Sequence, residues 1–256
     1  MKFSKTFFAI AALAAVSLGV QARTVEEIRK DGKIIVATEG QFAPFNFFEG
    51  KKLTGFEVEL AEALAQKMGL KVEWKTLGFD ALLAGLQQNR WDMVIASHGI
   101  NEERAKAVTF ADPHYCTGGV IVSKEGKVKT AADLAGKTVS VQTGTSYLSN
   151  VEKVSGIKSV KNYPKDPEAL AALTAGRVDA WVTDKFVAKE SLQSKAVAKA
   201  NLKIGDFLFV ERVAPAVAKG NTGLAQEINK ALAAVQSDGT YAKLSQKYFQ
   251  EDVRCK

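Results

Sequence analysis

The sequence predicts an α/β protein built of two similar lobes with a binding cleft between them. Three observations lead to this expectation: β-branched runs alternate with helical stretches from residue 33 onward, both halves of the chain show the same alternation, and one 15-residue segment is repeated. Strands that alternate with helices form a largely parallel sheet. The 256 residues, 46% apolar and 25% charged, suffice for one or two globular domains.

In the first half of the chain, strands and helices follow one another in a regular order. A β-branched run starts at Lys33, and apolar residues at helical spacing start at Phe56 and stop before Gly69, a residue type that commonly ends helices. We expect a strand over 33–38, a loop over 39–44, a helix over 56–68, a strand over 71–75, a helix over 80–88 and a strand over 93–96.

The second half repeats this order and ends in two helices. We expect a short helix over 131–134, a strand over 138–142, a helix over 145–153, a strand over 159–163, a helix over 167–174 and a strand over 180–182. The last two helices are predicted over 222–236 and 241–249, separated by a turn that contains Gly239.

One internal repeat suggests that the two halves are related. Residues 83–97 align without gaps on residues 170–184, and each copy runs from a helix through an Arg-x-Asp turn into an apolar strand. Each strand delivers a polar residue, Ser97 or Asp184, to its C-terminal end, where ligands bind in open α/β sheets. We therefore expect two lobes with a shared pocket; the alternative is chance similarity between two Ala/Leu-rich helices.

The N-terminus has the composition of a secretory signal peptide. Two lysines precede an apolar run over 7–20, and Ala22 supplies a small residue for cleavage. We predict a signal peptide over 1–22 and a mature chain that starts near Arg23. The alternative is a membrane anchor, which requires about 20 apolar residues. No cysteine follows the run to carry a lipid.

Charge, histidines and cysteines narrow the function classes. The formal net charge of +7 falls to +5 without the predicted signal peptide, and the basic residues are scattered, which argues against a nucleic-acid partner. His98 and His114 lack the spacing of zinc ligands, so no metal is expected. Cys116 and Cys255 lie 139 residues apart; in an oxidising compartment they could form a disulfide, and the alternative is two free thiols.

The polar motifs indicate recognition rather than catalysis. No signature of hydrolysis, phosphoryl transfer or dinucleotide binding is present, and no cofactor is expected. Asn101 is a suitable N-cap for a helix with Arg104 in its first turn, and a guanidinium can hold a carboxylate through two hydrogen bonds. Thr145 opens a second helix whose N-terminus attracts anions. Together with the carboxylate of Asp184, these groups fit a zwitterion; the alternative for Arg104 is a surface salt bridge.

Several short motifs occur in a fixed order along the chain. They are Phe42-Ala-Pro-Phe45-Asn-Phe47, Leu53-Thr-Gly-Phe56-Glu-Val-Glu-Leu60, Glu102-Glu-Arg-Ala105, Val108-Thr-Phe-Ala-Asp-Pro113, Val141-Gln-Thr-Gly-Thr145, Gly176-Arg-Val-Asp-Ala180 and Asp238-Gly-Thr-Tyr241. From about Lys33 to Phe249 the chain thus resembles the solute-binding proteins that serve ABC transporters for polar amino acids, such as the glutamine-, histidine- and lysine/arginine/ornithine-binding proteins.

This resemblance implies a type 2 periplasmic-binding-protein fold, in which two Rossmann-like lobes are joined by two hinge strands. Lobe one is then expected to comprise residues 23–115 and 214–256, and lobe two residues 118–210, with hinges near 114–118 and 211–215. The resemblance also implies a monomer in the periplasm that closes around one small amino-acid ligand and delivers it to the membrane permease of an ABC transporter.

The resemblance also assigns ligand-binding roles. Arg104 matches the arginine that holds the ligand carboxylate, Thr145 a residue of lobe two that supports it, and Asp184 the acid that accepts the α-ammonium. Phe42 and Phe79 match aromatic residues that enclose the ligand side chain, and Glu39 matches a position, usually Asp, that reads its head group. The predicted ligand-binding set is Glu39, Phe42, Phe79, Ser97, Gly99, Arg104, Gln142, Thr145, Ser146 and Asp184, with His98, Tyr147 and Thr183 as further candidates.

Two positions depart from the family pattern. Gly99 stands where the family usually has a Thr or Ser hydroxyl for the carboxylate, and Gln142 stands where lobe two often has Lys or Arg. We therefore expect a weaker or wider carboxylate-binding site. His98 either fills the space beside Gly99 or packs in the core.

The sequence thus predicts a binding protein, not an enzyme, for a polar or basic amino acid or a close derivative. Glu39 favours a side chain that donates hydrogen bonds, such as a cation or an amide. One alternative is a dehydratase-like enzyme of the same fold that acts on prephenate or arogenate, with Glu39 or Asp184 as general acid. Another is a stand-alone sensor.

Overall fold

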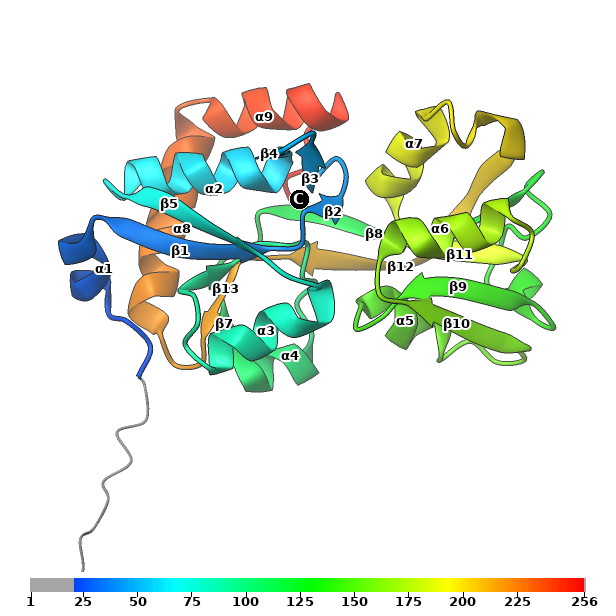
Figure 1. The fold of residues 1–256 in the computed structure, drawn as a ribbon, viewed down its shortest axis with the longest axis horizontal. Helices are drawn as coiled ribbons and strands as arrows, with labels where there is room; N and C mark the ends of the chain where they lie inside the picture. The colour runs from blue at the N-terminus through cyan, green and yellow to red at the C-terminus, as the bar shows by residue number, and fades with distance from the viewer. Residues whose placement is uncertain (1–20, 256) are drawn as a thin grey trace, which may run out of the picture.

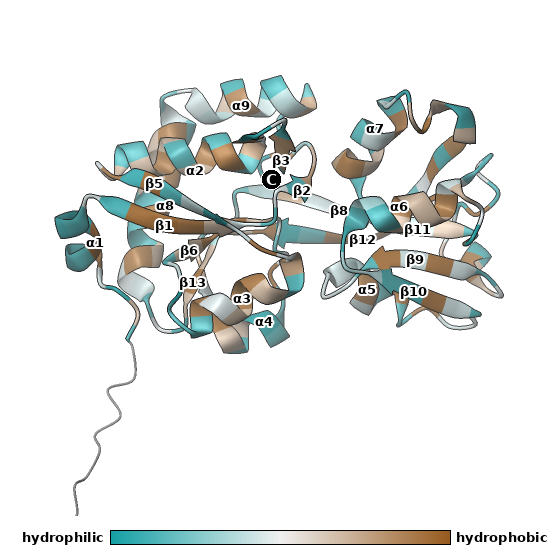
Figure 2. Cartoon of the chain, viewed as in Figure 1, coloured by the Kyte–Doolittle hydropathy of each residue, from teal (hydrophilic) through white to brown (hydrophobic). Residues whose placement is uncertain are grey.

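The computed structural model of the chain describes residues 21–255, and the predicted signal peptide lies almost entirely outside this range. The described part forms two lobes, each with a five-stranded sheet and flanking helices (Figure 1). In Figure 2 the central strands β1 and β9 are hydrophobic along much of their length. None of the helices in residues 21–255 is long and apolar enough to cross a membrane.

Lobe one contains a sheet of order β5-β1-β6-β13-β7 and a small sheet of order β2-β3-β4. The strands of the large sheet are β5 (Lys71–Thr76), β1 (Lys33–Thr38), β6 (Met93–Val94), β13 (Ala216–Ala218) and β7 (Val108–Phe110). The small sheet consists of β2 (Gln41–Phe42), β3 (Asn46–Glu49) and β4 (Lys52–Thr54). The helices are α1 (Val25–Asp31), α2 (Phe56–Lys67), α3 (Phe79–Gln87), α4 (Glu102–Ala107), α8 (Thr222–Ser237) and α9 (Thr240–Phe249).

Lobe two contains a sheet of order β10-β9-β11-β8-β12. Its strands are β10 (Ser159–Tyr163), β9 (Thr138–Gln142), β11 (Ala180–Asp184), β8 (Tyr115–Lys124) and β12 (Leu202–Val213). Its helices are α5 (Ser146–Val151), α6 (Asp166–Thr174) and α7 (Lys185–Gln193), with short 3₁₀ turns η1 (Ala132–Leu134) and η2 (Ala198–Ala200). The antiparallel strands β8 and β12 also connect the two lobes (Figure 1).

The two large sheets share one topology. In each, a central strand has parallel neighbours on both sides, β5 and β6 around β1, and β10 and β11 around β9. Two antiparallel pairings then complete each sheet. The sequence repeat falls on α3–β6 in lobe one and α6–β11 in lobe two. These equivalent positions support related lobes rather than chance similarity.

Several predicted boundaries differ from the structure for local reasons. The strand predicted over 93–96 ends at Val94, because the chain turns at Ser97, which has a positive φ of 56°. The helix predicted over 145–153 is shorter and spans Ser146–Val151. The loop predicted over 39–44 contains β2, a two-residue strand that packs with β3 and β4.

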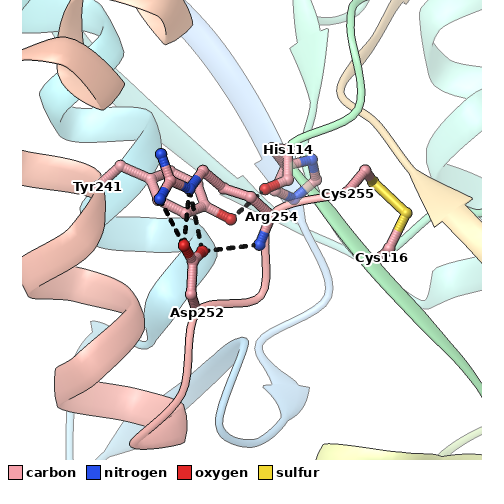
Figure 3. Close-up of a disulfide and its surroundings, with 6 residues drawn as sticks. All are labelled: His114, Cys116, Tyr241, Asp252, Arg254 and Cys255. Carbon is pink, nitrogen blue, oxygen red and sulfur yellow. Dashed lines mark hydrogen bonds and ion pairs between the residues drawn. A yellow bond between two sulfur atoms is a disulfide. The ribbon is translucent and has the colours of Figure 1, made fainter.

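Cys116 and Cys255 form a disulfide, which confirms the predicted pairing (Figure 3). Cys116 lies near the start of β8, and its backbone N–H also donates to the carbonyl of Val253 at 3.0 Å. The Tyr241 hydroxyl donates to the carbonyl of His114, two residues before Cys116. The C-terminal segment is thereby fixed to the chain at the point where β8 leaves lobe one.

Candidate functional site

A small cavity of about 10 Å³ lies between the two lobes. It is lined by Glu39, Phe42, Phe79, Ser97, Gln142, Thr145, Ser146 and Tyr147. All eight belong to the set predicted from the sequence, and they come from both lobes. Small-molecule pockets usually measure roughly 300–1,000 Å³, so an amino acid can enter only if the lobes move apart.

Side-chain bonds across the cleft hold the lobes together in this structure. The Gln142 amide of lobe two donates to Oε1 of Glu39 in lobe one at 2.7 Å. Arg104 of lobe one donates through Nη2 to the carbonyl of Gly144 in lobe two at 3.0 Å. The structure is therefore a closed form. Gln142, Glu39 and Arg104, all predicted as ligand-binding residues, take part in the bonds that hold it closed.

Glu39 follows β1 at the carboxyl end of the lobe-one sheet and is only 6% exposed. Burial raises its pKa to about 8, against the hydrogen bond from Gln142, which lowers it. The charges of Asp166 and Asp80 raise the pKa further. A positively charged ligand would therefore stabilise the ionised form of Glu39.

Arg104 lies in the first turn of α4, as its position after Asn101 predicts. The Asn101 side chain accepts from the Arg104 N–H at 2.8 Å and caps the helix. The guanidinium donates to the carbonyl of Gly99 at 2.9 Å and lies over the Phe79 ring at 5.6 Å. Arg104 does not line the cavity itself. Its guanidinium lies behind Phe79, and the hydrogen bonds to the carbonyls of Gly99 and Gly144 fix the plane of this group.

The segment Thr145–Tyr147 forms the lobe-two side of the cavity at the start of α5. Thr145 caps this helix by accepting from the Leu148 N–H at 3.2 Å, and its hydroxyl donates to the Gln142 carbonyl at 2.7 Å. These bonds hold the loop from β9 to α5 in one shape, with Ser146 and Tyr147 facing the cavity.

Asp184 ends β11 and is fully buried. Its Oδ2 accepts from the Thr117 hydroxyl at 2.5 Å, and its Oδ1 accepts from the N–H of Phe186 at 2.6 Å, which caps α7. Burial raises its pKa to about 7, while these hydrogen bonds lower it. Its neighbour Thr183 donates to Asp166 at 3.0 Å, and neither Asp184 nor Thr183 lines the cavity in this closed form.

His98 and Gly99 lie between Phe79 of the cavity and the end of β12. The His98 ring stacks on Phe79 with centroids 4.2 Å apart, and burial, followed by the charge of Arg104, lowers its pKa well below the usual range. A neutral, packed ring matches the packing alternative. Gly99 forms a bridge with Val213, so residues 98–100 lie beside the end of β12.

A buried carboxylate beneath the cavity was not predicted. Glu57, in the first turn of α2, accepts from the Ser97 N–H at 2.7 Å and from its hydroxyl at 3.1 Å. The same carboxylate accepts from Asn46 at 2.8 Å and contacts Nε2 of His114 at 2.9 Å. Glu57 thus holds Ser97 in its left-handed conformation, and the only available sequence signal was its place in the motif after Phe56.

No group of three or more His, Cys, Asp or Glu side chains within residues 21–255 is arranged to hold a metal ion. The candidate site is therefore a set of carboxylates, one guanidinium, hydroxyls and aromatic faces between two lobes. Such a set recognises a small polar molecule through charge and stacking.

Residues 34–251 match the family described as bacterial extracellular solute-binding proteins, family 3. The chain belongs to this family. One relative is the L-cystine-binding protein TcyJ of Escherichia coli (strain K12), which is 36% identical over 90% of this chain and 87% of its own length.

Solved structures that are similar to this chain have the same fold. An ancestral arginine-binding protein bound to arginine is 43% identical, with a TM-score of 0.80 over 85% of this chain and 98% of that one. The ancestral amino acid-binding protein AncCDT-1, a precursor of cyclohexadienyl dehydratase, is 33% identical, with a TM-score of 0.80 over 88% and 99% of the two chains. These similarities confirm the predicted two-lobed, type 2 fold.

Proposed function

We propose that the protein is a periplasmic receptor that closes around a cationic amino acid, such as arginine, and delivers it to the permease of an ABC transporter. The charge preference rests on Glu39, a buried carboxyl group in the cavity. Its partner there is the neutral amide of Gln142, and no cationic side chain is among the residues that line the cavity. Phe42 and Phe79 also line the cavity, and aromatic rings attract a guanidinium or ammonium group.

The backbone of the ligand has its own partners in this proposal. Arg104 and the start of α5 receive the α-carboxylate, and Asp184 receives the α-ammonium. Because the closed cavity is small, the ligand first binds to the open lobes and then replaces part of the contacts across the cleft, a hinge motion typical of this class. The predicted lobe boundaries and the predicted monomer stay part of the proposal.

A thermal-shift screen tests the ligand class. We expect arginine or lysine to raise the unfolding midpoint, since a ligand at 100 times its dissociation constant adds about 2.7 kcal/mol. Glutamate should have no effect above the pKa of Glu39, where the ionised carboxylate repels its side chain. Stabilisation by cystine alone would contradict the charge preference, and no response to any amino acid would contradict the receptor. Turnover of prephenate or arogenate would favour the enzyme instead.

The raised pKa of Glu39 predicts that affinity for arginine increases with pH. With a pKa of about 8, the carboxyl group is mostly protonated at about pH 6, and the ligand cation must displace that proton. Affinity should rise by up to about tenfold per pH unit below the pKa and level off above it. Asp184, with a pKa of about 7, acts in the same direction.

Calorimetry in two buffers of different ionisation enthalpy measures the protons released on binding. The wild type should release protons at about pH 7, and Glu39→Gln should release fewer and show a shallower pH profile. A pH-independent affinity in the wild type, or equal proton release by the variant, would contradict this assignment.

A further inference from the structure

Glu211, on β12, is a carboxylate that neither the repeat nor the motifs predicted. It does not line the cavity itself but lies close to Ser146 and Tyr147, which do. Its position follows from the backbone: Ile100 N–H donates to the Arg212 carbonyl at 2.8 Å, and Ala214 N–H donates to the His98 carbonyl at 3.2 Å. This pairing sets Glu211 directly beside Gly99.

The absence of a side chain at Gly99 is what admits this carboxylate. A Cβ atom built on Gly99 would lie 2.6 Å from Cδ of Glu211 and still closer to its Oε2. Carbon atoms that are not bonded cannot approach so closely, so Ser or Thr at this position would displace Glu211. At Gly99, where the family usually has a hydroxyl, the carboxylate of Glu211 therefore occupies the space that a side chain would take.

One oxygen of Glu211 has no partner. Its Oε1 is buried and makes no hydrogen bond in this structure, whereas the carboxyl group as a whole is hydrogen-bonded by Ser146 and Tyr147 and attracted by Arg104. Glu211 pairs with Thr117 across β12 and β8, and the Thr117 hydroxyl donates to Oδ2 of Asp184 at 2.5 Å, so the two carboxylates lie near the same residue of β8. A buried acceptor without a donor is unfavourable, and two neighbouring carboxylates favour a cation between them.

We propose that Glu211 is a further ligand-recognition residue that shares the α-ammonium of the bound amino acid with Asp184. The ammonium group brings three donors, enough for the free Oε1 of Glu211 and for an oxygen of Asp184. In this arrangement Gly99 does not weaken the site but exchanges a hydroxyl for the carboxylate of Glu211. The inference rests on the proposed function, since it requires a ligand with an α-ammonium.

The test compares arginine with 5-guanidinopentanoic acid, which has the same guanidinium and carboxylate but no α-ammonium. Glu211→Gln keeps the shape and removes the charge. We expect this variant to lose about tenfold or more in affinity for arginine, as for a lost charged hydrogen bond, and to bind the analogue as the wild type does. Gly99→Ser should give the same selective loss by displacing the carboxylate.

A control variant and unfolding measurements test whether the loss of affinity is specific to Glu211. Glu102→Gln removes an exposed carboxylate from α4 and should leave both affinities unchanged. Unfolding midpoints without ligand show whether each variant is folded. An equal loss for both ligands would indicate a structural role for Glu211, no loss would exclude it from recognition, and tighter binding would show that it competes with the ligand carboxylate; each overturns the proposal.

Failure of the proposed function would look different. If arginine does not bind the wild type, the charge preference is wrong, and the same comparison is made with the amino acid that the screen identifies and its desamino analogue. Selective loss with that pair supports the role of Glu211 whatever the side chain of the ligand is.

Discussion

Arg104→Ala should nearly abolish binding of the amino acid. Removing one partner of a buried charge pair costs roughly 3–5 kcal/mol, which corresponds to about 200-fold or more in affinity. The substitution also removes the hydrogen bond from lobe one to the Gly144 carbonyl, so the closed form itself becomes less stable. Calorimetry with the best ligand from the screen measures the loss.

Two further variants separate these contributions. Arg104→Lys keeps the charge but cannot donate to the carbonyls of Gly99 and Gly144 in the same plane, so its affinity should lie between wild type and alanine. Arg90→Ala removes an exposed arginine that lies over Trp91 and should bind as the wild type does. Unchanged affinity in Arg104→Ala would refute its role at the ligand carboxylate.

Replacing both Cys116 and Cys255 with serine should have the largest effect on stability. The disulfide joins residues 139 positions apart, and a loop of this length restricts the unfolded chain by roughly 4–5 kcal/mol in the chain-entropy model. Urea unfolding without ligand should show a lower midpoint and a steeper dependence on denaturant concentration, because the unfolded chain becomes less compact.

The reduced wild type provides the matched comparison for this variant. Its midpoint should coincide with that of the double serine variant, because both lack the same covalent link. If the oxidised wild type unfolds at the same urea concentration as the double variant, the disulfide does not contribute through the unfolded chain as argued here.

The regular elements were predictable because their signals are local. The strand over 33–38 and the strand over 138–142 have the predicted bounds, and the capping residues Asn101 and Thr145 begin helices as expected. The eight residues around the cavity were among the candidates, for different reasons. Ser97 follows a strand end, where a parallel sheet gathers its polar side chains, whereas Glu39, Phe42 and Phe79 were assigned through the family resemblance.

The parts that were missed depend on contacts between distant residues. Glu57 acts on Ser97, 40 positions away, and Glu211 acts on Gly99, more than a hundred positions away. Neither pairing leaves a periodic pattern in the sequence. The two-residue strand β2 was read as a loop because it is too short to show alternation, and it exists only through its pairing with β3.

The place of β13 in the lobe-one sheet determines the order in which the lobes can be completed during synthesis. Lobe two has all five strands once residue 213 is present, whereas β6 and β7 of lobe one gain their shared neighbour only with residues 216–218. Until then both strands have an unpaired edge, and such edges invite pairing with other chains. The lobe that begins the chain is thus the last to be finished, and it is the one that a growing polypeptide must protect longest.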